Sequence, residues 1–123
     1  MSRDLTEHKV GSLNEALQVI AIGQPQPPGM ACCDYSIRVP TGKGVYRTDP
    51  LIFQKGDPKD GINGISNEVL LAVVLDRLRG FQTGLGNCRE NAIAITNIET
   101  ALLYLQKRTR ERMERGVEGS TTP

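Results

Sequence analysis

Apolar and polar side chains alternate one by one in the first half of the chain. Over residues 31–39 this alternation places Cys33, Tyr35, Ile37 and Val39 on one face, as in a strand with one buried side. The run LNEALQVIAI becomes strand-like towards its end, and VYR and LIFQ predict two further short strands. Segments rich in proline and glycine separate these runs and predict loops. This half therefore predicts a small antiparallel sheet.

The second half changes to helical spacing. Residues 67–80 are apolar on most faces. They follow Ser66, a good N-cap, and end with Gly80, a residue typical of helix ends. After the short link FQTGLG, Asn87 begins a second helix as the first member of a capping-box-like pair. This helix is expected to run from residue 88 to about residue 114 and to end before a glycine.

Together these elements predict an α+β fold, in which a small N-terminal antiparallel β-sheet precedes a C-terminal helical hairpin with a long second helix. The length of 123 residues predicts a single domain over 1–123. Its parts are a β-rich half at 13–55, the helical hairpin at 66–115, and flexible ends at 1–12 and 116–123. The apolar first helix is expected to be buried between the sheet and the second helix. The second helix is nearly twice as long, so its uncovered part must contact the sheet or another chain, which predicts a homo-oligomer.

Composition supports association and argues against some function classes. Aromatic residues make up only 4% of the chain and there is no tryptophan, so large core side chains are few. A formal net charge of +1 is unlike the strong basic excess of a general nucleic-acid binder. The sequence shows no apolar signal core and no run of membrane-spanning length, so we expect an intracellular protein without a membrane partner.

The residue types needed for most catalytic sites are missing. The single histidine, His8, lies in a polar N-terminal stretch, so no Ser–His or Cys–His couple can be assembled. Cys32, Cys33 and Cys88 offer no metal-ligand spacing and are expected to be reduced thiols. The glycine-rich segments fit neither the P-loop nor the dinucleotide fingerprint. We therefore expect no enzyme activity, no metal and no cofactor.

The segment KRTRERMER, from Lys107 to Arg115, concentrates five cations and two carboxylates. Cations are favoured at helix C-termini and can pair with nearby glutamates, so a solvated helix end is one interpretation. Arg108 and Arg112, however, lie four residues apart on one face. Guanidinium groups bind phosphate oxygens through paired hydrogen bonds, so an anion site is the other interpretation.

The tip of the predicted hairpin offers a second candidate. Phe81 can close the core or stack on a base, and Asn91 can be solvated or hydrogen-bond a base edge or ribose. Asn91 and Arg108 are seventeen residues apart, a separation of about 25 Å along a helix. No small ligand can contact both on one chain. If both ends serve one pocket, two chains must lie antiparallel, which creates two equivalent pockets in each pair.

Residues 63–119 closely resemble the helical-hairpin domain of the phage anti-Thoeris sponge family, a hairpin shared with a shorter anti-CBASS sponge family. The motifs GFQ, CREN, LQKRTRERM and RGVEG carry the resemblance. The segments LNEALQVIAI, DYSIRV and LIFQKG extend it over nearly the whole chain. The resemblance implies a protein that acts in the cytoplasm of the infected bacterial host. It implies binding of glyco-cyclic ADP-ribose, the signal made by Thoeris TIR enzymes, without cleavage.

The resemblance also implies roles for particular residues. Phe81 of GFQ would stack on adenine, Asn91 of CREN would hydrogen-bond the ligand, and Arg108 and Arg112 of KRTRERM would hold its phosphates. Related proteins imply hexamers built as trimers of dimers. They also imply a separate site for cyclic di- or trinucleotides, for which Lys55 of FQKG is the candidate.

Two other functions compete with the sponge. A non-enzymatic phage regulatory protein could dock its arginine-bearing helix on an acidic partner, and a weak nucleic-acid binder would depend steeply on salt. The sponge hypothesis predicts that Arg108→Ala or Arg112→Ala abolishes capture and leaves folding intact, because both arginines are expected at the surface.

Overall fold

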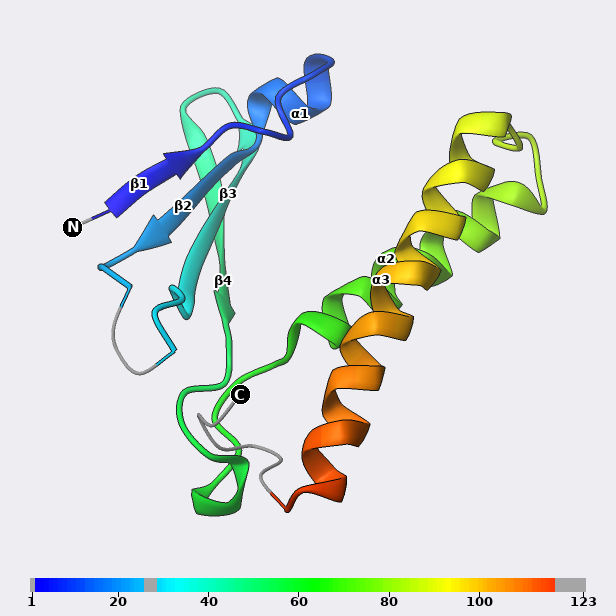
Figure 1. Ribbon diagram of the computed structural model, residues 1–123. Coiled ribbons are helices and arrows are strands. Elements are labelled where there is room, and N and C mark those ends of the chain that lie inside the picture. Colours follow the sequence, from blue (N-terminus) through cyan, green and yellow to red (C-terminus); the bar gives the residue numbers. More distant parts are fainter. Residues whose placement is uncertain (1, 26–28, 117–123) are drawn as a thin grey trace. The chain divides into compact units, whose positions relative to one another are not determined.

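The computed structural model describes residues 2–25 and 29–116 and divides into two compact units (Figure 1). The sheet unit comprises the chain up to Lys55 together with Ile62–Gly64. The hairpin unit comprises Gly56–Gly61 and the chain from Ile65 onward. A four-stranded antiparallel sheet in the first unit and a helical hairpin in the second confirm the predicted α+β fold class. That the two units form one domain stays a prediction.

The sheet is a simple meander, in which each strand is antiparallel to the next. Its strands in order are β1 (Ser2–Leu5), β2 (Gln18–Ile22), β3 (Asp34–Gly42) and β4 (Val45–Ile52). The predicted alternation appears in the register, since Ile37 lies opposite Val19 and Tyr35 lies opposite Ala21 on one face. Ala21 is fully buried, and the Tyr35 and Phe53 rings meet edge to face with centroids 5.6 Å apart. These contacts form the small core of the sheet unit.

The N-terminal half contains two features that the sequence did not predict. Residues 2–5, within the 1–12 segment expected to be flexible, form β1, which pairs with β2, while the flexibility of the segment stays a prediction. The polar sequence of β1 hides this pairing, because an edge strand is stabilised largely by backbone hydrogen bonds that carry no sequence signal. The two short strands predicted around Pro50 form the single strand β4. Proline is compatible with this strand because β4 lies at the sheet edge and pairs only with β3.

Short helices and a tight loop complete the first half of the chain. Helix α1 (Ser12–Ala16) precedes β2, and the 3₁₀ helix η1 (Pro58–Asp60) lies in the predicted 55–64 loop. The Asn63 side chain exchanges two hydrogen bonds of 2.8 Å with the backbone of Lys55. Gly64 lies so close to the Phe53 backbone that an added Cβ would be 2.4 Å from its carbonyl carbon. Only glycine fits this position without movement of the backbone.

Helix α2 (Asn67–Gln82) begins as predicted and ends two residues later than predicted. The Ser66 hydroxyl accepts a hydrogen bond of 3.2 Å from the Val69 amide, so the predicted N-cap is confirmed. Gly80 does not end the helix, since Thr83 is the C-cap. A glycine costs about 1 kcal/mol inside a helix, and here the helix continues through it because the following turn is hydrogen-bonded. The Thr83 hydroxyl donates to the Gly80 carbonyl oxygen at 2.7 Å.

Helix α3 (Arg89–Glu114) is the long second helix of the hairpin and lies beside α2 in antiparallel orientation (Figure 1). Cys88, and not the predicted Asn87, is its N-cap, and the Cys88 side chain forms no capping hydrogen bond. The two helices are joined across their exposed edge by an ion pair of 2.9 Å between Arg79 and Glu99. With 26 residues against 16 in α2, α3 exceeds its neighbour by 26 − 16 = 10 residues.

That the first helix is buried between the sheet and the second helix stays a prediction, because the sheet and the hairpin belong to different units. Leu75 is the buried residue of α2, whereas Val69, Val73 and Val74 are exposed to a large extent. A second helix covers only the face that it contacts, so α3 alone cannot bury all the apolar positions of α2. In α3, Leu103 and Tyr104 are exposed as well. Buried hydrophobic residues within 2–25 and 29–116 are Ala21, Cys32 and Leu75, a very small core for a chain of this length.

Candidate functional site

Phe81 lies in the last turn of α2, at the tip of the hairpin. Its side chain is 48% exposed, so it does not serve mainly to close the core. The guanidinium carbon of Arg77, one turn earlier in the helix, lies 5.3 Å from the centroid of the Phe81 ring. This arrangement is a cation–π contact on one face of the ring. Sequence reasoning missed Arg77, although its spacing of four residues from Phe81 could have revealed the contact.

Asn91 lies in the first turn of α3 and is connected to Phe81 through the inter-helix loop. Its side-chain amide donates a hydrogen bond of 3.0 Å to the carbonyl oxygen of Gly86. A Cβ added at Gly86 would lie 3.4 Å from the Phe81 Cβ, so this part of the loop packs directly against Phe81. The structure therefore brings two predicted site residues, Phe81 and Asn91, to the same tip.

Side chains of the tip hold the loop between the helices closed. Gln82 forms two hydrogen bonds with Cys88, accepting from its amide at 2.9 Å and donating to its carbonyl at 3.1 Å. The Asn87 side chain donates to the Gln82 carbonyl oxygen at 3.1 Å, which replaces the helix-capping role predicted for Asn87. These contacts order the backbone that carries Phe81 and Asn91. No simple spacing rule identifies the role of Gln82 from the sequence.

The two predicted arginines lie near the opposite end of α3 and differ in exposure. Arg108 is exposed, as predicted. Arg112 is only 7% exposed, so its predicted surface position is wrong. Helical spacing determines the face on which a side chain lies, but it does not show what the rest of the chain places over that face. Arg112 therefore contributes charge and packing at once.

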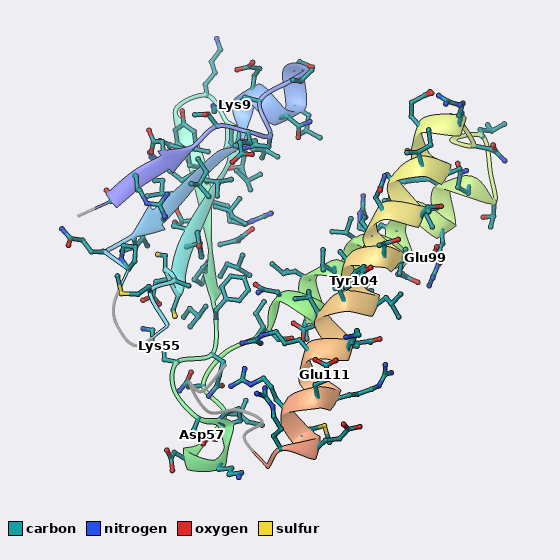
Figure 2. All side chains as sticks on the ribbon, viewed as in Figure 1. Lys9, Lys55, Asp57, Glu99, Tyr104 and Glu111 are labelled. Atoms are coloured by element: carbon teal, nitrogen blue, oxygen red, sulfur yellow. The ribbon has the colours of Figure 1, made fainter. Side chains whose placement is uncertain are left out.

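Lys107 and Glu111 form an ion pair along α3 beside Arg108, and Figure 2 shows Glu111 on the last turns of this helix. The hydrogen bond from Lys107, its charge, and more weakly the charge of Arg115 hold the pKa of Glu111 below its usual value. The same hydrogen bond raises the pKa of Lys107. Glu111 thus pairs with Lys107, the residue that immediately precedes the exposed Arg108 in the sequence.

The structure does not bring the arginine end and the tip together within one chain. Asn91 and Arg108 lie on one uninterrupted helix, seventeen residues apart. The separation of about 25 Å expected from helical rise therefore holds. A ligand of the size of one nucleotide cannot contact both groups on the same α3.

Lys55, the candidate for a second site, lies in the sheet unit and is labelled in Figure 2. Its ammonium group is 2.9 Å from an Asp34 carboxylate oxygen, and this hydrogen bond raises the pKa of Lys55. An anionic ligand at Lys55 would have to compete with Asp34. The hydrogen bonds between Asn63 and the Lys55 backbone restrict the backbone of the same residue.

The three cysteines are free thiols in different settings. Cys32 is buried and donates to the carbonyl oxygens of Ile22 and Asp34, Cys33 is half-buried, and Cys88 is exposed at the start of α3. Within the described part of the chain, no group of three or more His, Cys, Asp or Glu residues is arranged to hold a metal ion. In the same residues, no helix has the length and apolar character needed to span a membrane.

Comparison with known proteins defines the class of this hairpin. Residues 49–110 match the family model described as Acb2/Tad1, hairpin domain, which covers half of the chain and includes Lys55, Phe81, Asn91 and Arg108. The protein therefore belongs to the Acb2/Tad1 hairpin family, and the resemblance inferred from the sequence motifs is confirmed. Arg112 lies just beyond the matched residues.

A curated relative lies within this family. Thoeris anti-defense 1 from Bacillus phage SBSphiJ7 is 55% identical over 69 residues, which cover 55% of this chain and 49% of the relative. The match thus spans about half the length of that relative.

Proposed function

We propose that the protein is a phage anti-defence sponge that binds and sequesters glyco-cyclic ADP-ribose signals without degrading them, and so blocks Thoeris immunity in the cytoplasm of the infected host. The name of the phage relative, Thoeris anti-defense 1, supports the pathway. The hairpin geometry supports a binding role, because Phe81 at the end of α2 and Asn91 at the start of α3 share one tip, while Arg108 lies near the other end of α3.

The proposed pocket is completed by two chains. The length of α3 between Asn91 and Arg108 prevents one chain from presenting both groups to one small ligand. Two antiparallel chains would place the tip of one hairpin against the arginine end of the other, and two-fold symmetry would repeat the pocket. Exposed apolar side chains on both helices, among them Val73 and Leu103, supply surface for such contact. A hexamer of three such pairs is the proposed assembly.

Each predicted residue has a chemical role in this pocket. Phe81 offers an exposed aromatic face for adenine, and Asn91 offers an amide that both donates and accepts hydrogen bonds. Arg108 presents an exposed guanidinium for the phosphates, and the positive charge of Arg112 adds to the field there. Binding without bond cleavage requires no nucleophile, base or metal beyond these groups.

A binding and recovery experiment tests this function. Purified protein is titrated calorimetrically with glyco-cyclic ADP-ribose, and the complex is then heated and the released ligand analysed by chromatography. We expect saturable binding, a higher melting temperature with ligand, and recovery of the intact ring. Recovery of ADP-ribose would contradict the proposal in favour of an enzyme, and absence of binding would reject the proposed ligand.

Cyclic di- or trinucleotides are a second proposed ligand class, with Lys55 as the candidate contact. The Asp34 ion pair weakens this assignment, since the ligand must displace a carboxylate. Titration with a cyclic trinucleotide tests it: binding that Lys55→Gln abolishes supports the site, and binding that the variant retains rejects Lys55.

The alternative function is a regulatory protein that docks its arginine-bearing helix on an acidic partner. The exposed cations Arg108, Arg110 and Arg115 favour this candidate. It predicts no change in melting temperature with any cyclic nucleotide. It also predicts co-purification of an acidic protein, which charge reversal at Arg110 would abolish.

A further inference from the structure

Arg77 covers one face of the Phe81 ring and was not among the residues suggested by the sequence motifs. We propose that Arg77 is a positioning residue for base recognition: it holds the Phe81 ring so that the opposite face receives the adenine of the ligand. This inference rests on the proposed function and adds a residue to its site. The observation that carries it is the distance of 5.3 Å between the guanidinium carbon and the ring centroid.

The surroundings of Phe81 leave the ring little freedom. The Gly86 segment packs against the Phe81 Cβ from the loop side. Arg77 lies over the ring from the preceding turn of the same helix. An exposed phenylalanine in a last helical turn would otherwise sample several rotamers and pay an entropy cost when a base stacks on it. A guanidinium on one face limits that sampling, and the 48% exposure of Phe81 leaves ring surface for stacking.

The electrostatics of the contact favour the same arrangement. A cation attracts the negatively charged face of an aromatic ring. A purine stacked on the opposite face of the ring adds a second flat surface to the same arrangement. Arg77 therefore favours a ligand with an aromatic base through its contact with the Phe81 ring.

The chain offers a matched control on the same helix. Arg79 has the same charge and is likewise exposed, yet its guanidinium pairs with Glu99, whereas that of Arg77 contacts Phe81. Replacing Arg79 removes the same charge from the hairpin without removing the ring contact. A difference between Arg77 and Arg79 variants therefore isolates the contact with Phe81.

A double-mutant cycle tests the positioning role. Calorimetric titrations with glyco-cyclic ADP-ribose compare wild type, Arg77→Ala, Phe81→Leu and the double variant, with Arg79→Ala as control. We expect Arg77→Ala to weaken binding about two- to fivefold, the factor equivalent to one exposed cation–π contact. Arg79→Ala should change affinity by less than about 1.5-fold. In the Phe81→Leu background, Arg77→Ala should have no further effect, because Arg77 then has no ring to position.

Other outcomes of the cycle overturn the inference. An equal loss from Arg77→Ala in both backgrounds would mean that Arg77 contacts the phosphates directly. An unchanged affinity in Arg77→Ala would mean that the contact has no role in recognition. Arg77→Lys retains a cation and should recover part of the loss; failure of this rescue together with a lower melting temperature would indicate a structural role only.

A measurement without ligand separates this inference from the proposed function. In nuclear magnetic resonance spectra of the wild type, the Arg77 δ-protons should be shifted upfield by the ring current of Phe81, and Phe81→Leu should remove the shift. The Arg79 δ-protons should not respond. Absence of the Arg77 shift rejects the positioning contact even if the protein binds glyco-cyclic ADP-ribose. Presence of the shift in a protein that does not bind this ligand rejects the proposed function, and with it the role of the contact in recognition.

Discussion

The two ends of the hairpin are built in different ways. At the tip, hydrogen bonds from Gln82, Asn87 and Asn91 connect the two helices and their loop. At the other end, α3 extends ten residues beyond the length of its neighbour, and Lys107 and Glu111 form an exposed ion pair there. The tip is therefore held by hydrogen bonds between uncharged groups, whereas the arginine end combines an exposed ion pair with the buried Arg112.

Under the proposed function, this difference would separate recognition of the ligand's shape from electrostatic attraction of its phosphates. Stacking and amide hydrogen bonds depend on distance and orientation, so a preformed tip reduces the cost of ordering on binding. Attraction between arginines and phosphates depends less on exact placement and weakens with salt, because exposed charges are screened over about 10 Å at 0.1 M ionic strength. We infer that the tip selects the ligand and that the arginine end supplies much of the affinity.

The largest effect is expected at the arginine end. Arg108→Glu should weaken capture at least about 100-fold, because it removes a charge-assisted hydrogen bond of about 1.5–3 kcal/mol and adds repulsion of the phosphates. Calorimetric titration measures this loss. Arg110→Glu is the control, since Arg110 is exposed but lies two residues further along the helix on a different face. Equal losses in the two variants would show that only net charge matters at this end.

A smaller loss is expected from the aromatic tip. Phe81→Leu should weaken binding about tenfold, within the range of about 1–3 kcal/mol for stacking of one base. Its melting temperature should stay near that of the wild type, because Phe81 is about half exposed and leucine retains an apolar side chain there. Titration and thermal unfolding are measured on the same sample. A large loss of stability with unchanged affinity for the remaining folded protein would assign Phe81 to the core.

Order at the tip can be tested without changing a proposed contact residue. Gln82→Ala removes both hydrogen bonds to Cys88, each worth about 0.5–1.5 kcal/mol. We expect faster amide hydrogen exchange in residues 83–88 and binding that is about threefold weaker. Gln106→Ala, at an exposed position of α3, serves as the matched control. Unchanged exchange in the Gln82 variant would show that the tip is not held by this side chain.

The smallest effect is expected from the ion pair next to Arg108. Lys107→Gln should change affinity less than about twofold, because an exposed pair at this helical spacing contributes only about 0.3–0.5 kcal/mol. Titration at low and high salt detects any change. A loss as large as that of Arg108→Glu would place Lys107 among the phosphate-binding groups and would remove the distinction between the two residues.

The fold was largely predictable because its signals are local. Alternation along β3 and the serine cap of α2 each follow from neighbouring residues. The end of α2 was not predictable in this way. A glycine ends a helix only when the following residues do not continue the turn, and here the Thr83 hydroxyl donates a hydrogen bond to the Gly80 carbonyl oxygen and the helix continues to Gln82. The pairing of β1 also escaped prediction, because it depends on a strand more than ten residues away.

The candidate site was predictable as a set of residue types but not as an environment. Motif resemblance suggested Phe81 and Asn91, and the structure places them at one tip. The motifs could not show that Arg112 is buried while Arg108 is exposed. Arg112→Ala is therefore no longer a clean test of binding, because the loss of buried contacts is expected to lower stability as well.

The separation of Asn91 and Arg108 on α3 has a consequence for mixtures of variants. Under the proposed pairing, each chain supplies its tip to one pocket and its arginine end to the other pocket. A substitution at the tip and a substitution at the arginine end of the same chain therefore affect different pockets. When Phe81→Leu and Arg108→Glu proteins are unfolded together and refolded, every mixed pair should contain one pocket with both defects and one pocket with none. Two variants that each capture the signal poorly should therefore regain up to one quarter of the wild-type number of full-affinity sites, the share expected from random exchange of partners.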